Sequence, residues 1–255
     1  KIRKNILMDC VSYPATTAYF LERAFRQKHN VITCGSQIND QIIKLWNLED
    51  LNWEITPQDL YRGNTTPLQK VMEELPEGWQ PDFYLWIETG LSDIPSDLGS
   101  FDLPKVCYLI DTHIHYERHL EIAENFDFVF LAQKAYVPQM VRAGIKNVMW
   151  LPLACDPEIH AKVEVEKEFD VGFVGSISLT PDRRRNLLER LQKQFDLKPQ
   201  RKFMNEMAEH YSKSHIIFNN AINNLFCLIH ELFYFFWRRM PTYIKNILMW
   251  IISIY

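Results

Sequence analysis

The stretch Val106-Cys107-Tyr108-Leu109-Ile110, followed at once by Asp111-Thr112-His113, decides how this chain is interpreted. A short apolar run bounded by polar residues is typical of a strand buried on both faces of a parallel sheet. In open α/β sheets, ligands bind just beyond the carboxyl ends of the strands. Asp111 and His113 therefore occupy the position where such a protein usually carries out its chemistry.

Similar apolar runs recur on both sides of this stretch and alternate with segments of helical periodicity. We expect further strands at residues 6–8, 31–34, 82–87, 127–132 and 147–151, and helices at residues 15–28, 67–75, 117–125 and 133–143. Strands that alternate with helices of this length form a mostly parallel, doubly wound sheet. The pattern predicts one Rossmann-like domain over residues 1–155.

The pattern restarts after a charged connector, which we take as a linker at residues 156–168. The run Phe169-Asp170-Val171-Gly172-Phe173-Val174-Gly175-Ser176 reads as a new strand that turns into a helix at residues 181–195. The predicted fold class is thus α/β with two Rossmann-like domains, the second an incomplete one at residues 169–224.

Residues 225–255 do not continue this pattern. They are apolar and rich in aromatic residues, and the last glycine of the chain is Gly175. One hypothesis is out-of-frame translation beginning near Asn224, which would leave the second domain truncated. The other is peripheral membrane contact, because Arg238 and Arg239 separate two apolar runs, each too short to span a bilayer.

Composition sets the broad class of the protein. The chain has 255 residues, of which 47% are hydrophobic and 24% charged, and a net charge of −4. This balance predicts globular domains and argues against a nucleic-acid partner, which needs a concentrated basic face. The five cysteines are scattered singly and no signal-peptide pattern opens the chain, so we expect reduced thiols and a cytoplasmic location.

The candidate catalytic residues are Asp111, His113 and Glu88. Glu88 ends the strand at residues 82–87, and Asp156 follows the strand at 147–151, so we expect these acids to gather along one sheet edge. The alternative is structural, since an aspartate after a strand often caps a helix and a histidine often packs among neighbours. His119 and His160 are expected at the surface. No spacing of histidine and acidic residues resembles a metal site.

The sequence Gly172-x-x-Gly175-Ser176 has two interpretations. Glycine-rich turns before a helix can hold a phosphate on free backbone N–H groups, and Arg184 and Lys213 would then supply positive charge. Alternatively, the glycines only permit a tight turn and the arginines lie on a solvated helix face. The third glycine of a dinucleotide fingerprint is missing.

Four segments in order resemble the CgeB-type (spore maturation protein-like) glycosyltransferases, which are GT-B enzymes related to glycosyltransferase group 1. They are Pro104-Lys105-Val106-Cys107-Tyr108-Leu109-Ile110-Asp111-Thr112-His113, Phe126-Asp127-Phe128-Val129-Phe130, Trp150-Leu151-Pro152-Leu153-Ala154-Cys155-Asp156-Pro157, and Asp170-Val171-Gly172-Phe173-Val174-Gly175-Ser176. The resemblance covers about residues 82–220. It stops near Asn224, where the family continues with an acidic donor-site motif that this chain lacks.

The resemblance implies sugar transfer from a UDP- or GDP-type nucleotide-sugar, with no permanently bound cofactor. The acceptor would be a sugar, a lipid or a protein. Gly175 and Ser176 would line the donor diphosphate, and Asp111 and His113 would face the acceptor across the cleft between the two domains. Because the donor motif is missing, weak or absent turnover is expected. The alternative is a non-catalytic α/β binding or interaction module.

Overall fold

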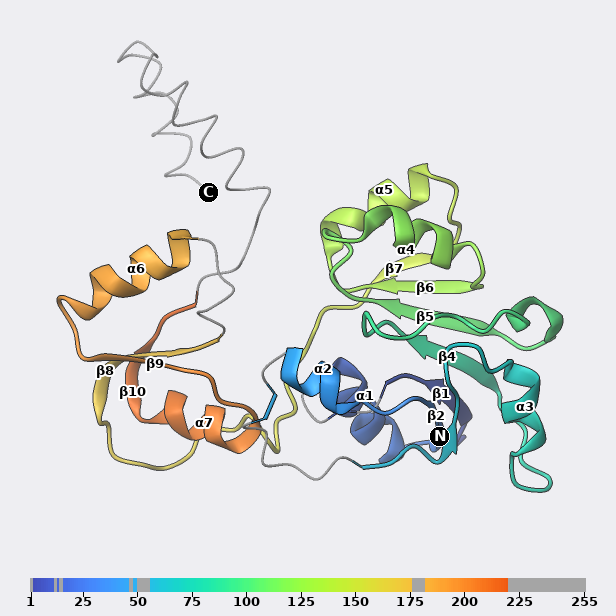
Figure 1. Ribbon diagram of the computed structural model, residues 1–255, viewed down its shortest axis with the longest axis horizontal. Coiled ribbons are helices and arrows are strands. Elements are labelled where there is room, and N and C mark those ends of the chain that lie inside the picture. Colours follow the sequence, from blue (N-terminus) through green and yellow to red (C-terminus); the bar gives the residue numbers. More distant parts are fainter. Residues whose placement is uncertain are drawn as a thin grey trace, which may run out of the picture. The chain divides into compact units, whose positions relative to one another are not determined.

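The computed structural model describes residues 2–11, 13, 16–45, 48–49, 56–175 and 182–219 (Figure 1). The chain divides into two compact units, unit 1 (Lys1–Ala161) and unit 2 (Lys162–Tyr255). The division falls inside the stretch 156–168 that the sequence indicates as a linker. Ser176 and the tail 225–255, with the truncation and membrane-contact hypotheses attached to it, lie outside the described residues.

Unit 1 is built on one parallel sheet. Its strands are β1 (Asn5–Asp9), β2 (Asn30–Gly35), β3 (Leu60–Tyr61), β4 (Phe83–Ile87), β5 (Lys105–Leu109), β6 (Phe128–Leu131) and β7 (Val148–Trp150). They lie in the order β3-β2-β1-β4-β5-β6-β7, and every neighbouring pair is parallel. The strand order reverses between β1 and β4. This switch point is where an open α/β sheet forms its ligand crevice.

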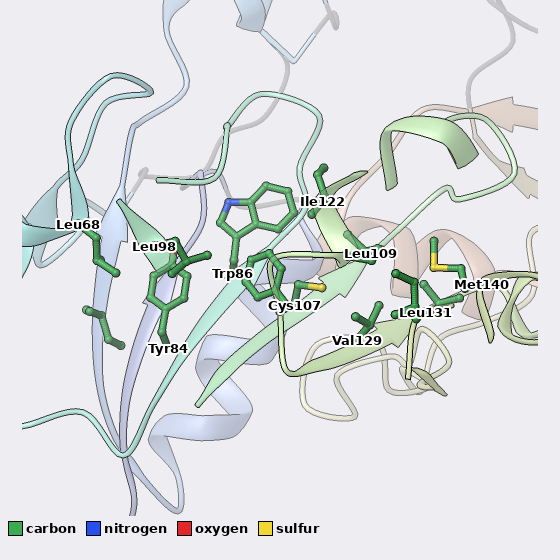
Figure 2. Packing of buried hydrophobic residues seen from close by; sticks show 14 of the residues in the cluster. Leu68, Tyr84, Trp86, Leu98, Cys107, Leu109, Ile122, Val129, Leu131 and Met140 are labelled. Atoms are coloured by element: carbon green, nitrogen blue, oxygen red, sulfur yellow. The ribbon is translucent and has the colours of Figure 1, made fainter. Parts of the chain in front are cut away.

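Helices cover both faces of this sheet because alternate residues of each strand point to opposite sides. The helices are α1 (Thr17–Arg26), α2 (Asp40–Leu45), α3 (Leu68–Glu73), α4 (Tyr116–Ala123) and α5 (Val137–Arg142), with 3-10 turns η1 (Leu98–Ser100) and η2 (Lys134–Tyr136). The larger apolar cluster joins strand residues such as Trp86 and Leu109 to α3, α4 and α5, and Figure 2 shows these side chains on one side of the sheet. The smaller cluster packs β1, β4 and β5 against α1.

Unit 2 has a second, smaller parallel sheet. Its elements are β8 (Phe169–Val174), α6 (Asp182–Gln192), β9 (Leu197–Gln200), α7 (Met204–Ser212) and β10 (Ser214–Ile217). The strand order is β10-β8-β9, and both pairs are parallel. Pro199 lies in β9, which is an edge strand, where a missing N–H is tolerated. The apolar cluster of this unit is small, with Val171, Phe173, Leu188 and Leu197 buried.

The α/β class with parallel sheets is confirmed, and each predicted strand and helix of residues 2–175 has a counterpart within about two residues at most boundaries. The sequence did not reveal α2, β3, η1 or β9. These elements are two to six residues long, which is too short for a hydrophobic period to be recognised. Within the described part of the chain, no helix is both long enough and apolar enough to cross a membrane.

Candidate functional site

The carboxyl ends of β4 and β5 bring two of the predicted residues together. The two strands pair in parallel with Ile87 opposite Tyr108, and the Glu88 N–H donates to the carbonyl of Tyr108 at 3.0 Å. Glu88 therefore lies beside the chain that continues from β5 into Asp111. The negative charge of Asp111 is close enough to raise the pKa of Glu88. An acidic pair thus forms at this sheet edge.

Glu88 is almost fully buried, with 8% of its surface exposed. Burial is the main cause of its raised pKa, and Asp111 adds to the effect. The backbone N–H groups of Gly90 and Ile110 donate to its carboxylate and lower the pKa in part, as does the nearby His115. A buried carboxyl group with a raised pKa at a switch point is a recognised signature of a functional site.

Asp111 has an unusual backbone conformation. It is solvent-exposed, and its φ of 58° lies in the left-handed region, which non-glycine residues rarely adopt. Its carbonyl accepts from the N–H groups of Ile114 at 2.8 Å and His115 at 3.3 Å, so it closes the turn that leads into α4. Aspartate is one of the few non-glycine residues that adopt this conformation in tight turns, so the turn itself accounts for it.

His113 is exposed in the same turn, and no contact ties it to the acidic pair. A different histidine, His119 of α4, reaches the pair, with Nε2 3.8 Å from Glu88 Oε2. Its Nδ1 lies 3.1 Å from Thr112 Oγ1. The surface position expected for His119 is wrong, because only 1% of its area is exposed. Burial, with the charges of His115 and Arg118, lowers its pKa to about 4, so His119 is neutral at pH 7.

Three buried polar atoms around this edge have no hydrogen-bond partner among the described residues. They are Thr89 Oγ1, Ser92 Oγ and His119 Nε2. Native proteins pair nearly all buried polar atoms, and clustered exceptions call for a specific explanation. Together with Glu88 and Asp111, they give this edge hydroxyl, imidazole and carboxylate groups that can bind a polar ligand. We call Glu88, Asp111, Thr112 and His119 the switch-point cluster.

A buried ionic group lies next to the switch point, and no sequence pattern predicts it. Asp9 ends β1 with 0% exposure, and its carboxylate contacts the guanidinium of Arg62 and the hydroxyl of Tyr84. Burial raises the pKa of Asp9, while the Arg62 charge and Tyr84 act in the opposite direction. Arg62 Nη2 also donates to the carbonyl of Asp93 at 2.8 Å. Arg62 therefore connects β1 to the loop that follows β4.

Asp156 does not join the acids at this edge. Its carboxylate forms an ion pair with Arg23 of α1 at 2.8 Å, which lowers the pKa of Asp156. Arg23 also pairs with Glu158 at 2.8 Å, so the segment after β7 is fixed to α1. The part that Asp156 plays is structural.

The sheet edge also carries a pocket of about 660 Å³ on the side of β1, β2 and β3. Its lining residues lie at the ends of these strands and in the loops that follow: Val11 after β1, Gly35 at the end of β2, Ser36, Gln37, Ile38, Asn39 and Ile42 after it, Gln58, Tyr61, Gly63 and Asn64 around β3, and Leu91. Its volume lies within the range typical of small-molecule sites, about 300–1,000 Å³. None of the residues that line this pocket is among the candidate site residues predicted from the sequence.

In unit 2, Gly172 is part of a strand and not of the turn in which a phosphate-binding role was expected. It lies within β8, and a Cβ added to it would come 1.9 Å from Ser214 Oγ of β10. Its lack of a side chain is explained by this close approach of two paired strands.

Gly175 follows β8, but its N–H already donates to the carbonyl of Gln200 at 3.0 Å. It therefore offers no free backbone donor for a phosphate. Arg184 of α6 lies nearby, because its guanidinium is 5.6 Å from the ring of Phe173 and that ring also borders Gly175. The structure thus places Gly175 and Arg184 together.

Lys213 lies at the other end of the strands. It precedes β10 and pairs with Glu168 at 3.0 Å and Glu209 at 2.9 Å, and these partners raise its pKa. Four residues of β10 separate it from the carboxyl edge, which is about 10 Å or more at roughly 3.3 Å per residue. Lys213 and Gly175 cannot bind the same phosphate group in this arrangement.

Comparison with known proteins does not identify the chain. A search of protein-family models finds no match, and no curated protein is detectably similar in sequence. Among the described residues, no three histidine, cysteine or acidic side chains gather closely enough to hold a metal ion.

Proposed function

We propose that the chain is a glycosyltransferase of GT-B type, which moves a sugar from a UDP- or GDP-type nucleotide-sugar to an acceptor hydroxyl. The observation that carries this proposal is the acidic pair Glu88 and Asp111 at the carboxyl ends of β4 and β5, next to the switch point of the sheet. The CgeB-type resemblance supports it, since Asp111 belongs to the resembling segments. In this proposal unit 1 binds the acceptor and unit 2 binds the donor.

The chemistry assigns different parts to the two acids. The acceptor oxygen attacks the anomeric carbon, the bond from that carbon to the diphosphate oxygen breaks, and the nucleoside diphosphate leaves with the bonding electrons. The acceptor proton passes to Asp111, which is exposed and so accessible to the hydroxyl. Glu88 lies buried beside it and acts as a positioning residue. Arg184 supplies positive charge for the departing diphosphate.

The test is release of UDP or GDP from a panel of nucleotide-sugars by the full chain. We expect Asp111→Asn to lower this release at least about 100-fold, since a general base contributes about 10²–10⁴-fold. His113→Asn is the matched control from the same turn, and separates the two predicted bases. Because turnover is expected to be weak, the binding of each nucleotide-sugar is measured alongside it, and the proposal fails if none of them binds.

A second candidate is a non-catalytic binding module, and the state of unit 2 favours it. The Gly175 N–H and the Lys213 ammonium are both engaged in internal contacts, which leaves fewer of the predicted donor-site groups available. This candidate predicts ligand binding to unit 1 without turnover of any nucleotide-sugar.

A further inference from the structure

The pocket beside β1, β2 and β3 plays no part in the reaction steps described above. Two of its apolar lining residues are buried, with Val11 1% and Ile38 8% exposed. A third lining residue, Gly35, has to be glycine, because its φ is 134° and a Cβ there would lie 1.9 Å from the carbonyl oxygen of Cys10. The close approach of β1 and β2 therefore shapes the cavity.

The polar side chains of the pocket are uncharged, and hydrogen bonds orient the amides of Asn39 and Gln58. The Gln58 amide nitrogen donates to the Cys10 carbonyl at 2.7 Å, which leaves its oxygen as an acceptor. The Asn39 oxygen accepts from the N–H of Ile42 at 2.9 Å, which leaves its amide nitrogen as a donor. The pocket thus presents both donors and acceptors. A hydroxyl group both donates and accepts, so it can satisfy either kind.

The uncharged lining of the pocket favours a neutral ligand. None of the described residues that line the pocket carries a charge. Arg62, the residue after β3, is 1% exposed and its guanidinium is committed to Asp9 and the Asp93 carbonyl. A phosphate or carboxylate ligand would therefore find no counter-charge among these residues, whereas a neutral ligand needs none.

An exposed aromatic ring completes the lining. Tyr61 at the end of β3 keeps 70% of its surface exposed, although it is a large side chain. A rigid ring of this kind gives contact area to a flat, partly apolar ligand at low entropic cost. The carbon-bound hydrogens of a pyranose ring form such a face, while its hydroxyls lie around the rim.

We infer that this pocket binds a neutral saccharide, with its hydroxyls on the amides of Asn39 and Gln58 and its ring against Tyr61. The binding of a saccharide in this pocket is independent of the proposed function. Its role as the acceptor of the sugar transfer rests on the proposed function, because the sheet edge that forms the pocket also carries the switch-point cluster.

The test is titration of the full chain with neutral methyl glycosides of glucose, galactose, mannose and N-acetylglucosamine, followed by saturation-transfer NMR and calorimetry. We expect at least one of them to bind, and glucuronate and glucose 6-phosphate to bind at least about tenfold more weakly. Tyr61→Ala should weaken binding about tenfold, which corresponds to one lost aromatic contact. Tyr61→Phe keeps the ring and should bind within about twofold of the unchanged chain.

Trp150→Ala is the matched control, because Trp150 is an exposed aromatic residue of the same sheet that does not line the pocket. Failure of all the neutral glycosides to bind, equal binding of the charged sugars, or equal losses in Tyr61→Ala and Trp150→Ala would each overturn the inference. Nucleotide-sugar binding is measured separately. Saccharide binding without nucleotide-sugar binding removes the proposed function alone, and nucleotide-sugar binding without saccharide binding removes this inference alone.

Discussion

The two sheets place their charged residues differently. In unit 1, Asp9 and Arg62 pair at the carboxyl end of β1 with 0% and 1% of their side chains exposed. In unit 2, Lys213 pairs with Glu168 and Glu209 before β10, where all three side chains are at least 27% exposed. A buried pair excludes water and strengthens each electrostatic interaction, while an exposed pair is screened. The comparison points to unit 1 as the place where charge is organised for a function.

The largest loss of stability is expected from removing one partner of the buried pair of Asp9 and Arg62. Arg62→Met leaves the Asp9 carboxylate buried without its counter-charge, so we expect a loss of about 3–5 kcal/mol in the free energy of unfolding. Urea titration followed by tryptophan fluorescence measures it, since Trp86 is buried in the same unit. The double variant Asp9→Leu with Arg62→Met should recover most of the loss. A loss below about 1 kcal/mol in the single variant would contradict the comparison.

The next largest effect is the change in the free energy of unfolding with pH that His119 causes. Unfolded His119 takes up a proton as the pH falls through 6.5, whereas the folded residue does so only at about pH 4. Its contribution to stability is therefore lost between pH 6.5 and 4, by up to about 3 kcal/mol. Glu88 acts in the opposite sense, because its raised pKa favours the folded state as the pH falls.

The measurement that isolates His119 is the difference between the unchanged chain and His119→Gln in urea titrations from pH 7 to pH 4. The difference should shrink as the pH falls, since the glutamine cannot be protonated. A difference that is constant over this range would mean that His119 is not buried as a neutral imidazole.

A smaller effect is expected from packing in unit 2. Gly172→Ala places a methyl group against Ser214, and overpacking of this kind costs about 1–3 kcal/mol. Hydrogen exchange of peptides that contain β8 and β10 reports it locally. Ser214→Gly in the same chain should restore protection, because it removes the atoms that the new methyl group meets. Loss of protection that Ser214→Gly does not restore would point to another role for Gly172.

The smallest effect should follow Lys213→Met. Its ion pairs with Glu168 and Glu209 lie in solvent, so water and salt already screen them. We expect the hydrogen exchange of β10 to match that of the unchanged chain, and donor binding to be unaffected. A clear loss of nucleotide-sugar binding would return Lys213 to the donor site.

Part of the candidate site could be predicted from local sequence. Glu88 and Asp111 follow two apolar strands, and parallel strands end at a common edge, which is how the sequence brings them together. The burial of His119 also had a signal, since it shares the helix face of Ile122 and Ala123 at three- and four-residue spacing. No local pattern marked Arg62, because arginine is usually exposed and β3 is only two residues long.

The sequence by itself determined the alternation of strands and helices in unit 1 and the sheet edge at which its polar residues lie. Both follow from hydrophobic periods that are local in the chain. Only the tertiary structure decided the strand order, the pairing of Asp9 with a residue 53 positions away, and the pocket beside β3. These features depend on which distant segments of the chain pack together. The free energy of burial selects that packing, and it leaves no periodic pattern in the sequence.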